Sequence, residues 1–488
     1  MVQTTTLETT ENHLGSEPRT NPDKVNQVIN KENKSGTLTL YIPSNFDIDK
    51  LVKDNPPTFK YHRDNFIYLA HLINDLPSRK KTDKVLVDYV PFYSKLIQRR
   101  VRDYRKHLDY LVEQGVFEEN KQYIVGKKSR SFRFSESFDT IIKPTVITKP
   151  TLIKSILKFI DLDDDVCSLY QTADKDELYY LTKWFNGKLT VDMNGAKKYL
   201  EGLRQQELDQ FLFKYDAMRR FNSRYIVLLK IERGEFAHTI DKTARRLHTV
   251  LTQLKSELRQ FIQYNGKPLI AIDITNSQPY LSTILFNYEK FRENNISSLI
   301  TLYNNTYNTT DIFNSQLYYV SKNVKNAKDS ASVNKYIEMV KSGRLYEEFG
   351  KILVERNLLT DSLLLRKEAK TIIFSSIFSP NQAIAYNEEM KIFKEVFPDV
   401  YEIYRGVKQN EHRTLACLLQ NLEAKLVLEN ACKIITEEHP EIPLFTLHDS
   451  IITTEGNEEY VYNVLYEVLL KAIGIPPTLK YERWEKVA

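Results

Sequence analysis

Two aspartates that are far apart in the chain follow apolar, strand-like segments. Asp273 follows the run LIAI that begins at Leu269, and Asp449 lies between the two apolar halves of IPLFTLHDSIITT, which begins at Ile442. The second pattern predicts a β-hairpin with its acid at the turn. Two carboxylates at one sheet edge could bind the two divalent cations that phosphoryl transfer uses. Taken alone, either aspartate is more typical of a turn or a cap.

A third segment, LLLRKEAKTIIFSSIFS from Leu363 to Ser379, has the spacing of a helix. Within it, two cations and two aromatic residues recur every four residues and form one ridge: Arg366, Lys370, Phe374 and Phe378. Such a ridge suits a nucleotide, because cations pair with phosphates and an aromatic ring packs against a base or a sugar. For the ridge alone, a partly buried helix with extended cationic side chains is the simpler explanation.

Taken in order, these three elements resemble the polymerase motifs of the family A DNA polymerases and of the related single-subunit phage and mitochondrial RNA polymerases. Asp273-Ile274-Thr275 resembles the first motif, the ridge the second, and His448-Asp449 the third. Two further segments are similar to family motifs: RRLHT, which contains Arg246, and LLQNLEAKLV, which contains Gln420. The resemblance covers about residues 243–468 and leaves the first 240 residues unexplained.

The resemblance implies an α+β right-hand fold, with an antiparallel palm sheet and helical fingers and thumb. It implies that Asp273 and Asp449 are catalytic and hold two Mg²⁺ ions, with Mn²⁺ as an alternative metal. It implies that Lys370 contacts the α-phosphate and acts as a general acid. The remaining implied contacts are with the nucleotide (Arg366, Lys370, Phe374, Phe378 and Gln278) and with the primer–template (Arg246, Gln420 and His448).

The sequence departs from the family pattern at positions that bear on sugar choice. Phe378-Ser379 replaces the usual Tyr-Gly, and Ser450 after Asp449 is the form seen in the RNA polymerases. Gln278 falls where the DNA polymerases place a bulky residue against the ribose 2′-hydroxyl, and Phe374 also suits a DNA enzyme. We therefore expect a DNA polymerase that uses dNTPs, with an RNA polymerase or primase that uses NTPs as the alternative.

Positive charge is concentrated in one part of the chain. Residues 79–133 contain 15 Lys or Arg and 7 Asp or Glu, although the net charge of all 488 residues is only +5. Helical spacing at 65–76, 92–97 and 99–114, followed by short strand-like pieces, predicts a winged helix-turn-helix that binds nucleic acid. A helical domain with a merely soluble basic face is the alternative. The expected DNA contacts are Arg99, Arg100, Arg102, Arg105, Lys106, Lys127 and Lys128.

Composition limits the remaining classes. Hydrophobic residues make up 42% and charged residues 27%, which excludes collagen-like and wholly disordered chains. Apolar runs long enough to span a membrane are missing, and three cysteines favour a reducing compartment, so we expect a cytoplasmic protein of a bacterial or phage-infected cell. The expected divisions are a disordered tail (1–36), the winged helix-turn-helix (37–140), a helical thumb-like or linker region (141–242), and palm and fingers (243–488).

This organisation predicts a polymerase that replicates a mobile element, plasmid or phage from DNA template and primer. A non-catalytic DNA-binding replication initiator is the remaining alternative. It differs because its polymerase-like half would be only a scaffold, which has no physical need for two acids at one sheet edge.

Overall fold

A computed structural model gives the structure of the chain. It describes residues 36–79, 89–120, 129–159, 162–163, 166–167, 178–210, 214–241, 244–296, 320, 322–357 and 365–485. The predicted disordered tail, apart from Gly36, and the predicted DNA contacts Lys127 and Lys128 lie outside these ranges. Within the described part of the chain, no helix combines the length and the apolar composition that crossing a bilayer requires.

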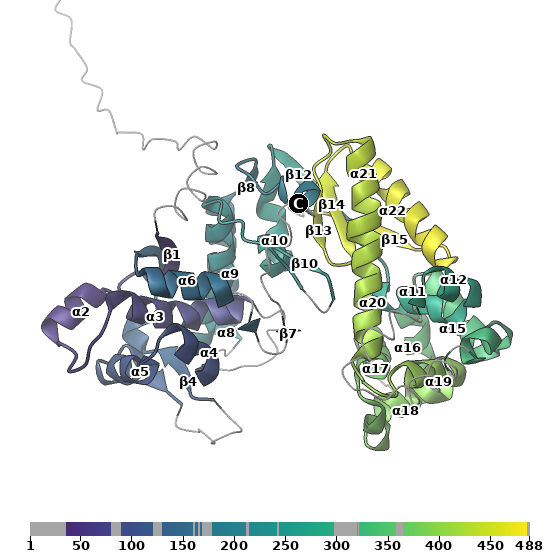
Figure 1. Ribbon diagram of the computed structural model, residues 1–488, viewed down its shortest axis with the longest axis horizontal. Helices are drawn as coiled ribbons and strands as arrows, with labels where there is room; N and C mark the ends of the chain where they lie inside the picture. The colour runs from purple at the N-terminus through teal and green to yellow at the C-terminus, as the bar shows by residue number, and fades with distance from the viewer. Residues whose placement is uncertain are drawn as a thin grey trace, which may run out of the picture.

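The N-terminal unit combines helices with a small antiparallel sheet (Figure 1). Its elements, in chain order, are α3 (Arg63–Ser78), β2 (Val90–Pro91), α4 (Ser94–Arg100), α5 (Tyr104–Glu113), β3 (Phe117–Glu119) and β4 (Ser131–Phe134). The strand order is β2-β4-β3, so the first strand pairs with the last. Before these elements come β1 (Leu38–Pro43) and α2 (Ile48–Asp54), and β1 pairs with β5 (Ile142–Ile147).

The helix predicted over residues 99–114 is wrong, because the chain forms two helices there. Helix α4 ends at Arg100, Val101 is extended with φ −126° and ψ 101°, and α5 begins at Tyr104. Val101 is nevertheless buried, as are Tyr104 and Leu108. Val101 therefore fits the apolar spacing of a helix in the sequence, although its side chain reaches the core from the turn between the two helices.

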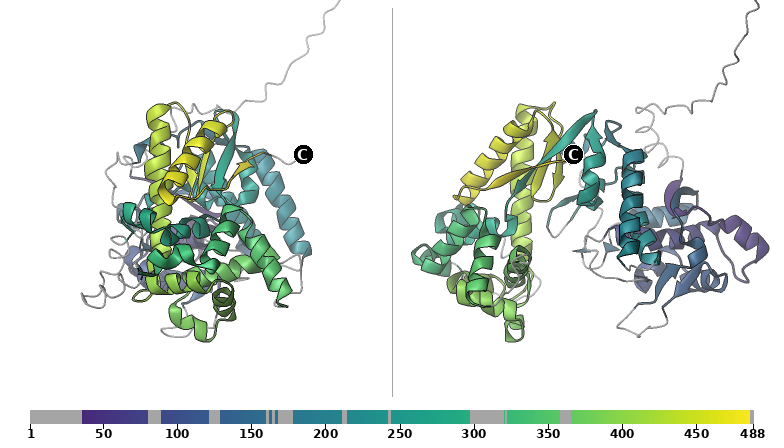
Figure 2. Two further views of the ribbon diagram at one scale, coloured as in Figure 1. Left: turned by 90° about the vertical axis from the view of Figure 1, so that its right-hand side faces the viewer. Right: turned by 180° about the vertical axis from the view of Figure 1, so that it is seen from behind.

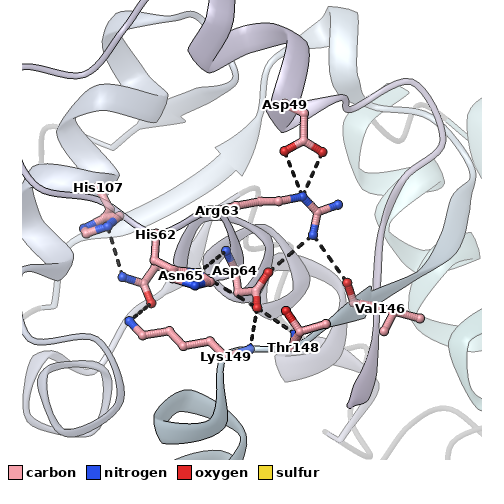
Figure 3. A network of polar contacts seen from close by, with 9 residues as sticks. All are labelled: Asp49, His62, Arg63, Asp64, Asn65, His107, Val146, Thr148 and Lys149. Atoms are coloured by element: carbon pink, nitrogen blue, oxygen red, sulfur yellow. Dashed lines mark hydrogen bonds and ion pairs between the residues drawn. The ribbon is translucent and has the colours of Figure 1, made fainter. Parts of the chain in front are cut away.

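A buried network fixes α3 against the segments that follow this sheet (Figure 3). The side chain of Asp64 is almost fully buried and accepts the backbone N–H groups of Thr148 and Lys149, each at 2.7 Å. These residues lead into α6 (Pro150–Phe159), so Asp64 satisfies donors near a helix start. Asn65 accepts from Lys149 Nζ at 3.0 Å and lies 3.1 Å from His107 Nε2 on α5. The network joins α3, α5 and α6.

A second buried contact joins α3 to the middle of the chain. Asp75 on α3 accepts from Lys230 Nζ at 3.0 Å, and Arg79 Nη2 lies 2.6 Å from it. Lys230 belongs to α9 (Lys214–Glu232), which packs on α8 (Met193–Asp209). The region predicted as helical also contains α7 (Tyr179–Thr182), the short strands β6 (Leu162–Asp163) and β7 (Val166–Cys167), and β8 (Leu189–Val191).

An antiparallel sheet of six strands lies between the N-terminal unit and the C-terminal helices (Figure 1). Its order is β13-β14-β12-β11-β8, and β15 pairs with β12. The bounds are β11 (Ile262–Tyr264), β12 (Lys267–Ile274), β13 (Phe445–Leu447), β14 (Ser450–Thr454) and β15 (Leu479–Arg483). The mixed helix and sheet class with an antiparallel sheet is confirmed. Because β8 belongs to this sheet, the sheet extends across the predicted boundary at residue 243.

Helices from the C-terminal half pack into one large core on one side of this sheet (Figure 2). They include α11 (Ser277–Ser282), α12 (Tyr288–Glu293), α15 (Ala331–Lys341), α16 (Leu345–Glu355), α17 (Leu365–Phe378), α18 (Glu388–Val396), α19 (Pro398–Val407) and α22 (Glu458–Ile473). A long helix beside them consists of α20 (Thr414–Ala424), an eight-residue π-helix (Lys425–Cys432) and α21 (Lys433–Glu438). The end of the sheet that carries Asp273 therefore lies next to the C-terminal helices.

Candidate active site

The structure brings the two predicted aspartates together at one end of the sheet. Asp273 is the penultimate residue of β12, and its Cα pairs with that of Ser450, the first residue of β14. Asp449 precedes Ser450 in the β13–β14 turn, and its backbone carbonyl accepts the N–H of Ile274 at 3.2 Å. The central strand and the hairpin, remote in sequence, thus place both acids side by side.

The charge state of Asp273 reflects this proximity. Burial, the charge of Asp449 and the charge of Glu482 on β15 together raise the pKa of Asp273 to about 7, although Arg259 and Lys480 oppose the shift. Glu482 itself is bound by Arg259, whose Nη1 lies 2.8 and 3.0 Å from its two carboxylate oxygens. Asp273 therefore meets negative charge from the β13–β14 turn and from β15, which a bound cation would neutralise.

The donor set fits magnesium. Mg²⁺ prefers carboxylate oxygen, keeps several waters, and usually takes only one or two protein carboxylates together with substrate phosphates. Among the residues that the structure describes, no group of three or more His, Cys, Asp or Glu side chains forms a closed metal site. Asp273 and Asp449 supply two carboxylates at one edge of the sheet. Two carboxylates are enough for an ion whose remaining ligands are water and substrate oxygens.

The turn that carries Asp449 depends on an unusual backbone at His448. His448 has a φ of 56°, in the left-handed region that histidine adopts more readily than a β-branched residue does. Its ring lies edge-on to that of His248, with 5.5 Å between the ring centres. His248 belongs to β10 (Leu247–His248), which pairs with β9 (Thr239–Ile240). The strand that follows Arg246 is thus held against the acid-bearing turn.

The predicted ridge lies on α17 as expected, and its cations are exposed. Arg366 forms an ion pair with Glu347 and lies over the ring of Tyr346, 5.4 Å from its centre. Lys370 lies 5.1 Å from the centre of the Phe374 ring. The Phe374 ring contacts Tyr346 and Phe378 edge-on, with centres 6.5 and 5.4 Å apart. The two aromatic members thus pack partly on the core, and the two cations face solvent.

Tyr346 connects this ridge to the aspartates, and no sequence pattern pointed to it. Burial raises the pKa of the Tyr346 hydroxyl, the charge of Asp449 raises it further, and the charge of Arg366 lowers it. The hydroxyl is thus close enough to both groups to sense their charges. Tyr346 therefore contacts the ridge directly and senses the charge of the acid-bearing turn.

The end of α17 is held by a buried lysine. Lys408 Nζ donates to the carbonyl oxygens of Ser376 and Ser379, at 2.6 and 2.9 Å. Burial lowers the pKa of Lys408 to about 8. A cation at a helix C-terminus also matches the helix dipole. The end of the predicted ridge, Phe378 and Ser379, is thereby fixed in place.

Two of the three remaining predicted residues bind a carboxylate, Glu423, that no sequence pattern pointed to, and the third, Gln420, lies on the same helix as this acid. Arg246 Nε donates to Glu423 Oε1 at 2.9 Å, and Gln278 Nε2 donates to Glu423 Oε2 at 2.7 Å. Gln420 is half-buried on α20, the helix that carries Glu423. The available signal was an acid inside the apolar stretch LQNLEAKL, a position where a helix buries its side chains.

The predicted DNA-contacting residues of the N-terminal unit are mostly exposed. Arg99 lies on α4, Arg102 in the turn, and Arg105 and Lys106 in the first turn of α5. Arg100 differs, because it is half-buried and its Nη1 donates to the Tyr68 hydroxyl at 2.5 Å. Arg100 is therefore the member of this set that is least available to a phosphate.

Comparison with known proteins gives little further information. The chain matches no protein-family model and no curated protein sequence. Among solved structures, it is similar to the POL domain of Pol1 from M. smegmatis, in complex with DNA primer-template and dNTP. The TM-score is 0.36 and the sequence identity 12%, over 59% of this chain and 56% of that chain. The match thus extends over little more than half of that structure.

Proposed function

We propose that the chain is a template-directed nucleotidyltransferase, a DNA polymerase of the family A type that uses two Mg²⁺ ions. One observation carries the proposal. Asp273 and Asp449, from a strand and a hairpin remote in sequence, lie side by side at a sheet end, and burial together with the charge of Asp449 raises the pKa of Asp273 to about 7. Such a pair costs stability unless cations bind it, which favours a catalytic rather than a structural role.

In this proposal the chain's own residues supply binding and orientation. Asp273 and Asp449 hold the metal ions, which when bound would neutralise the triphosphate and activate the primer 3′-hydroxyl. Lys370, exposed on α17, binds the α-phosphate and donates a proton to the departing pyrophosphate. Arg366 exchanges its ion pair with Glu347 for the γ-phosphate. Phe374 packs against the sugar and base of the incoming nucleotide.

The N-terminal unit is proposed to be a winged helix-turn-helix that binds DNA. The order α3, β2, α4, α5, β3, β4 and the pairing of β2 with β4 support it, since this topology places a short helix pair beside a β-ribbon. Arg102, Arg105 and Lys106 would then contact phosphates. Together with the polymerase unit, this module suits replication of a mobile element, plasmid or phage in the cytoplasm of a bacterial or phage-infected cell.

Primer extension tests the catalytic proposal. A labelled DNA primer on a DNA template is incubated with the protein, Mg²⁺ and either dNTPs or NTPs, alongside D273N and D449N. Extension with dNTPs that both substitutions abolish is the expected result. D209N serves as the matched control, because Asp209 is an exposed aspartate at the end of α8 that binds only a nearby glutamine, Gln205, among the contacts that the structure gives it.

A second candidate is an RNA polymerase or primase, and Ser450 favours it. The residue after Asp449 is this serine and not a second acid. Ser450 is buried, and its hydroxyl donates to the Leu447 carbonyl at 3.2 Å. Synthesis with NTPs alone would establish this candidate. If neither substrate is incorporated and the protein still binds DNA, the non-catalytic replication initiator becomes the better description.

A further inference from the structure

Glu423 is the most completely engaged buried acid beside the two aspartates. Its side chain is 1% exposed, and it accepts hydrogen bonds from three residues on two other segments. Arg246 binds Oε1, with Nη2 2.6 Å away, whereas Ser277 Oγ and Gln278 Nε2 bind Oε2 at 3.1 and 2.7 Å. Burial and the charge of Asp449 raise the pKa of Glu423, but the ion pair with Arg246 lowers it and favours the ionised carboxylate. Glu423 thus joins α20, the Arg246 segment and the start of α11.

This arrangement determines which way the Gln278 amide points. A carboxylate accepts hydrogen bonds only, so the NH₂ group of Gln278 must face Glu423 and its carbonyl oxygen must face away. That carbonyl oxygen is buried and has no hydrogen-bond partner among the described residues. The same is true of the Thr275 hydroxyl and of both polar atoms of the Asn276 side chain.

These unmatched atoms lie on one short segment that begins two residues after Asp273. Thr275, Asn276 and Gln278 are each more than nine-tenths buried. Asn276 has a φ of 54°, so the backbone turns sharply there. Buried polar atoms without partners are unfavourable, and at a site they are expected to bind polar groups of a ligand. Beside two aspartates that are proposed to hold the metal ions of a nucleotide, the fitting ligand group is a hydroxyl on the sugar of that nucleotide.

We propose that Glu423 is a positioning residue that orients the Gln278 amide so that only its carbonyl oxygen meets the 3′-hydroxyl of the bound nucleotide, which a dNTP carries and a ddNTP lacks. The inference rests on the proposed polymerase function and deepens it. Glu423 does not touch the substrate in this arrangement; it acts through Gln278. In E423Q, the Gln278 amide is free to turn and to present its NH₂ group instead.

The experiment measures incorporation of single nucleotides by the full-length protein with dNTP, ddNTP and NTP, which differ only in sugar hydroxyls. We expect E423Q to lower kcat/KM for the dNTP by about fivefold to tenfold, the loss expected for one uncharged hydrogen bond between Gln278 and the sugar. We also expect the ratio of kcat/KM between dNTP and ddNTP to narrow by a similar factor. E423D keeps a negative charge beside Arg246, but its shorter side chain no longer reaches Gln278. It should also narrow the ratio of kcat/KM between dNTP and ddNTP, and it replaces E423Q as the test if E423Q does not fold.

Two further variants separate positioning from general destabilisation. The double variant E423Q/Q278A should be no worse than Q278A, because a residue that acts through Gln278 loses its effect when the amide is absent. E207Q is the matched control, since Glu207 is also a buried acid bound by an arginine, Arg224 Nη2 at 2.9 Å, but lies on α8. It should leave the dNTP to ddNTP ratio unchanged.

The outcomes distinguish this inference from the proposed function. If the wild-type protein extends primers but E423Q and E423D keep its dNTP to ddNTP ratio, the inference alone is overturned. Additive losses in E423Q/Q278A would overturn it too. If the wild-type protein incorporates no nucleotide, the proposed function fails, and the inference fails with it.

Discussion

The acid pair should destabilise the metal-free protein, and replacing Asp273 by asparagine should therefore stabilise it. Asp273 has a pKa of about 7 in the folded chain, against an ordinary value of 3.8. A raised pKa means that the folded state holds the proton more tightly than the unfolded state does. Stability is then lost as the pH rises past about 4, and the loss is complete above about pH 7.

The expected magnitude follows from these two pKa values. Each pH unit between them corresponds to about 1.4 kcal/mol, so ionised Asp273 lowers the free energy of unfolding by about 4 kcal/mol at pH 8. At pH 5 the loss should be only about 1.5 kcal/mol. The asparagine side chain of D273N cannot ionise, so this variant should be more stable than the wild type by these amounts, and it should also be inactive.

Urea unfolding in EDTA at pH 5 and pH 8 measures this difference. D209N controls for the removal of one negative charge at an exposed site, and it should change stability by less than about 0.5 kcal/mol at both pH values. Adding Mg²⁺ at pH 8 should stabilise the wild type more than D273N, because binding to the folded state alone shifts the equilibrium. A D273N gain that is absent, or equal at pH 5 and pH 8, would refute the reasoning.

Three further predictions concern other parts of the chain. R102A/R105A should weaken the salt dependence of binding to duplex DNA. In a salt titration, the slope of log K against log salt should fall in magnitude by about 0.9 for each phosphate contact that the variant loses. An unchanged slope would show that these arginines do not bind phosphates. K408M should reduce the free energy of unfolding by about 2 kcal/mol, because the carbonyl oxygens of Ser376, at the end of α17, and of Ser379, just after it, lose their donor; urea unfolding at pH 7 measures this loss. H448V should cost about 1–2 kcal/mol, because valine does not tolerate φ 56°, whereas H448G should be nearly neutral in the same assay.

Several elements of the site follow from local sequence pattern. The apolar run before Asp273 and the alternating halves around Asp449 predicted the strand and the hairpin, and both form. The four-residue spacing from Arg366 predicted one helical ridge, and α17 forms it, with its two cations exposed and its two aromatic residues packed partly on the core. These features depend on interactions between near neighbours in sequence, which periodicity records directly.

Other elements were decided by contacts between distant segments. The break at Val101 was hidden, because a buried residue in a turn and a buried residue in a helix have the same apolar side chain. The entry of β8 into the acid-bearing sheet was equally hidden, since three residues carry too little pattern to predict a strand and its partner.

The amino-acid sequence by itself determined which residues are the candidates for the chemistry: two aspartates after strands, and a cationic and aromatic helix between them. Only the tertiary structure decided that Asp273 and Asp449 share an edge, and that Glu423 is buried between Arg246 and Gln278. The physical reason is that strand pairing and burial depend on the whole packed chain. A lone acid within an apolar helix shows neither its partners nor its charge until the segments that surround it are in place.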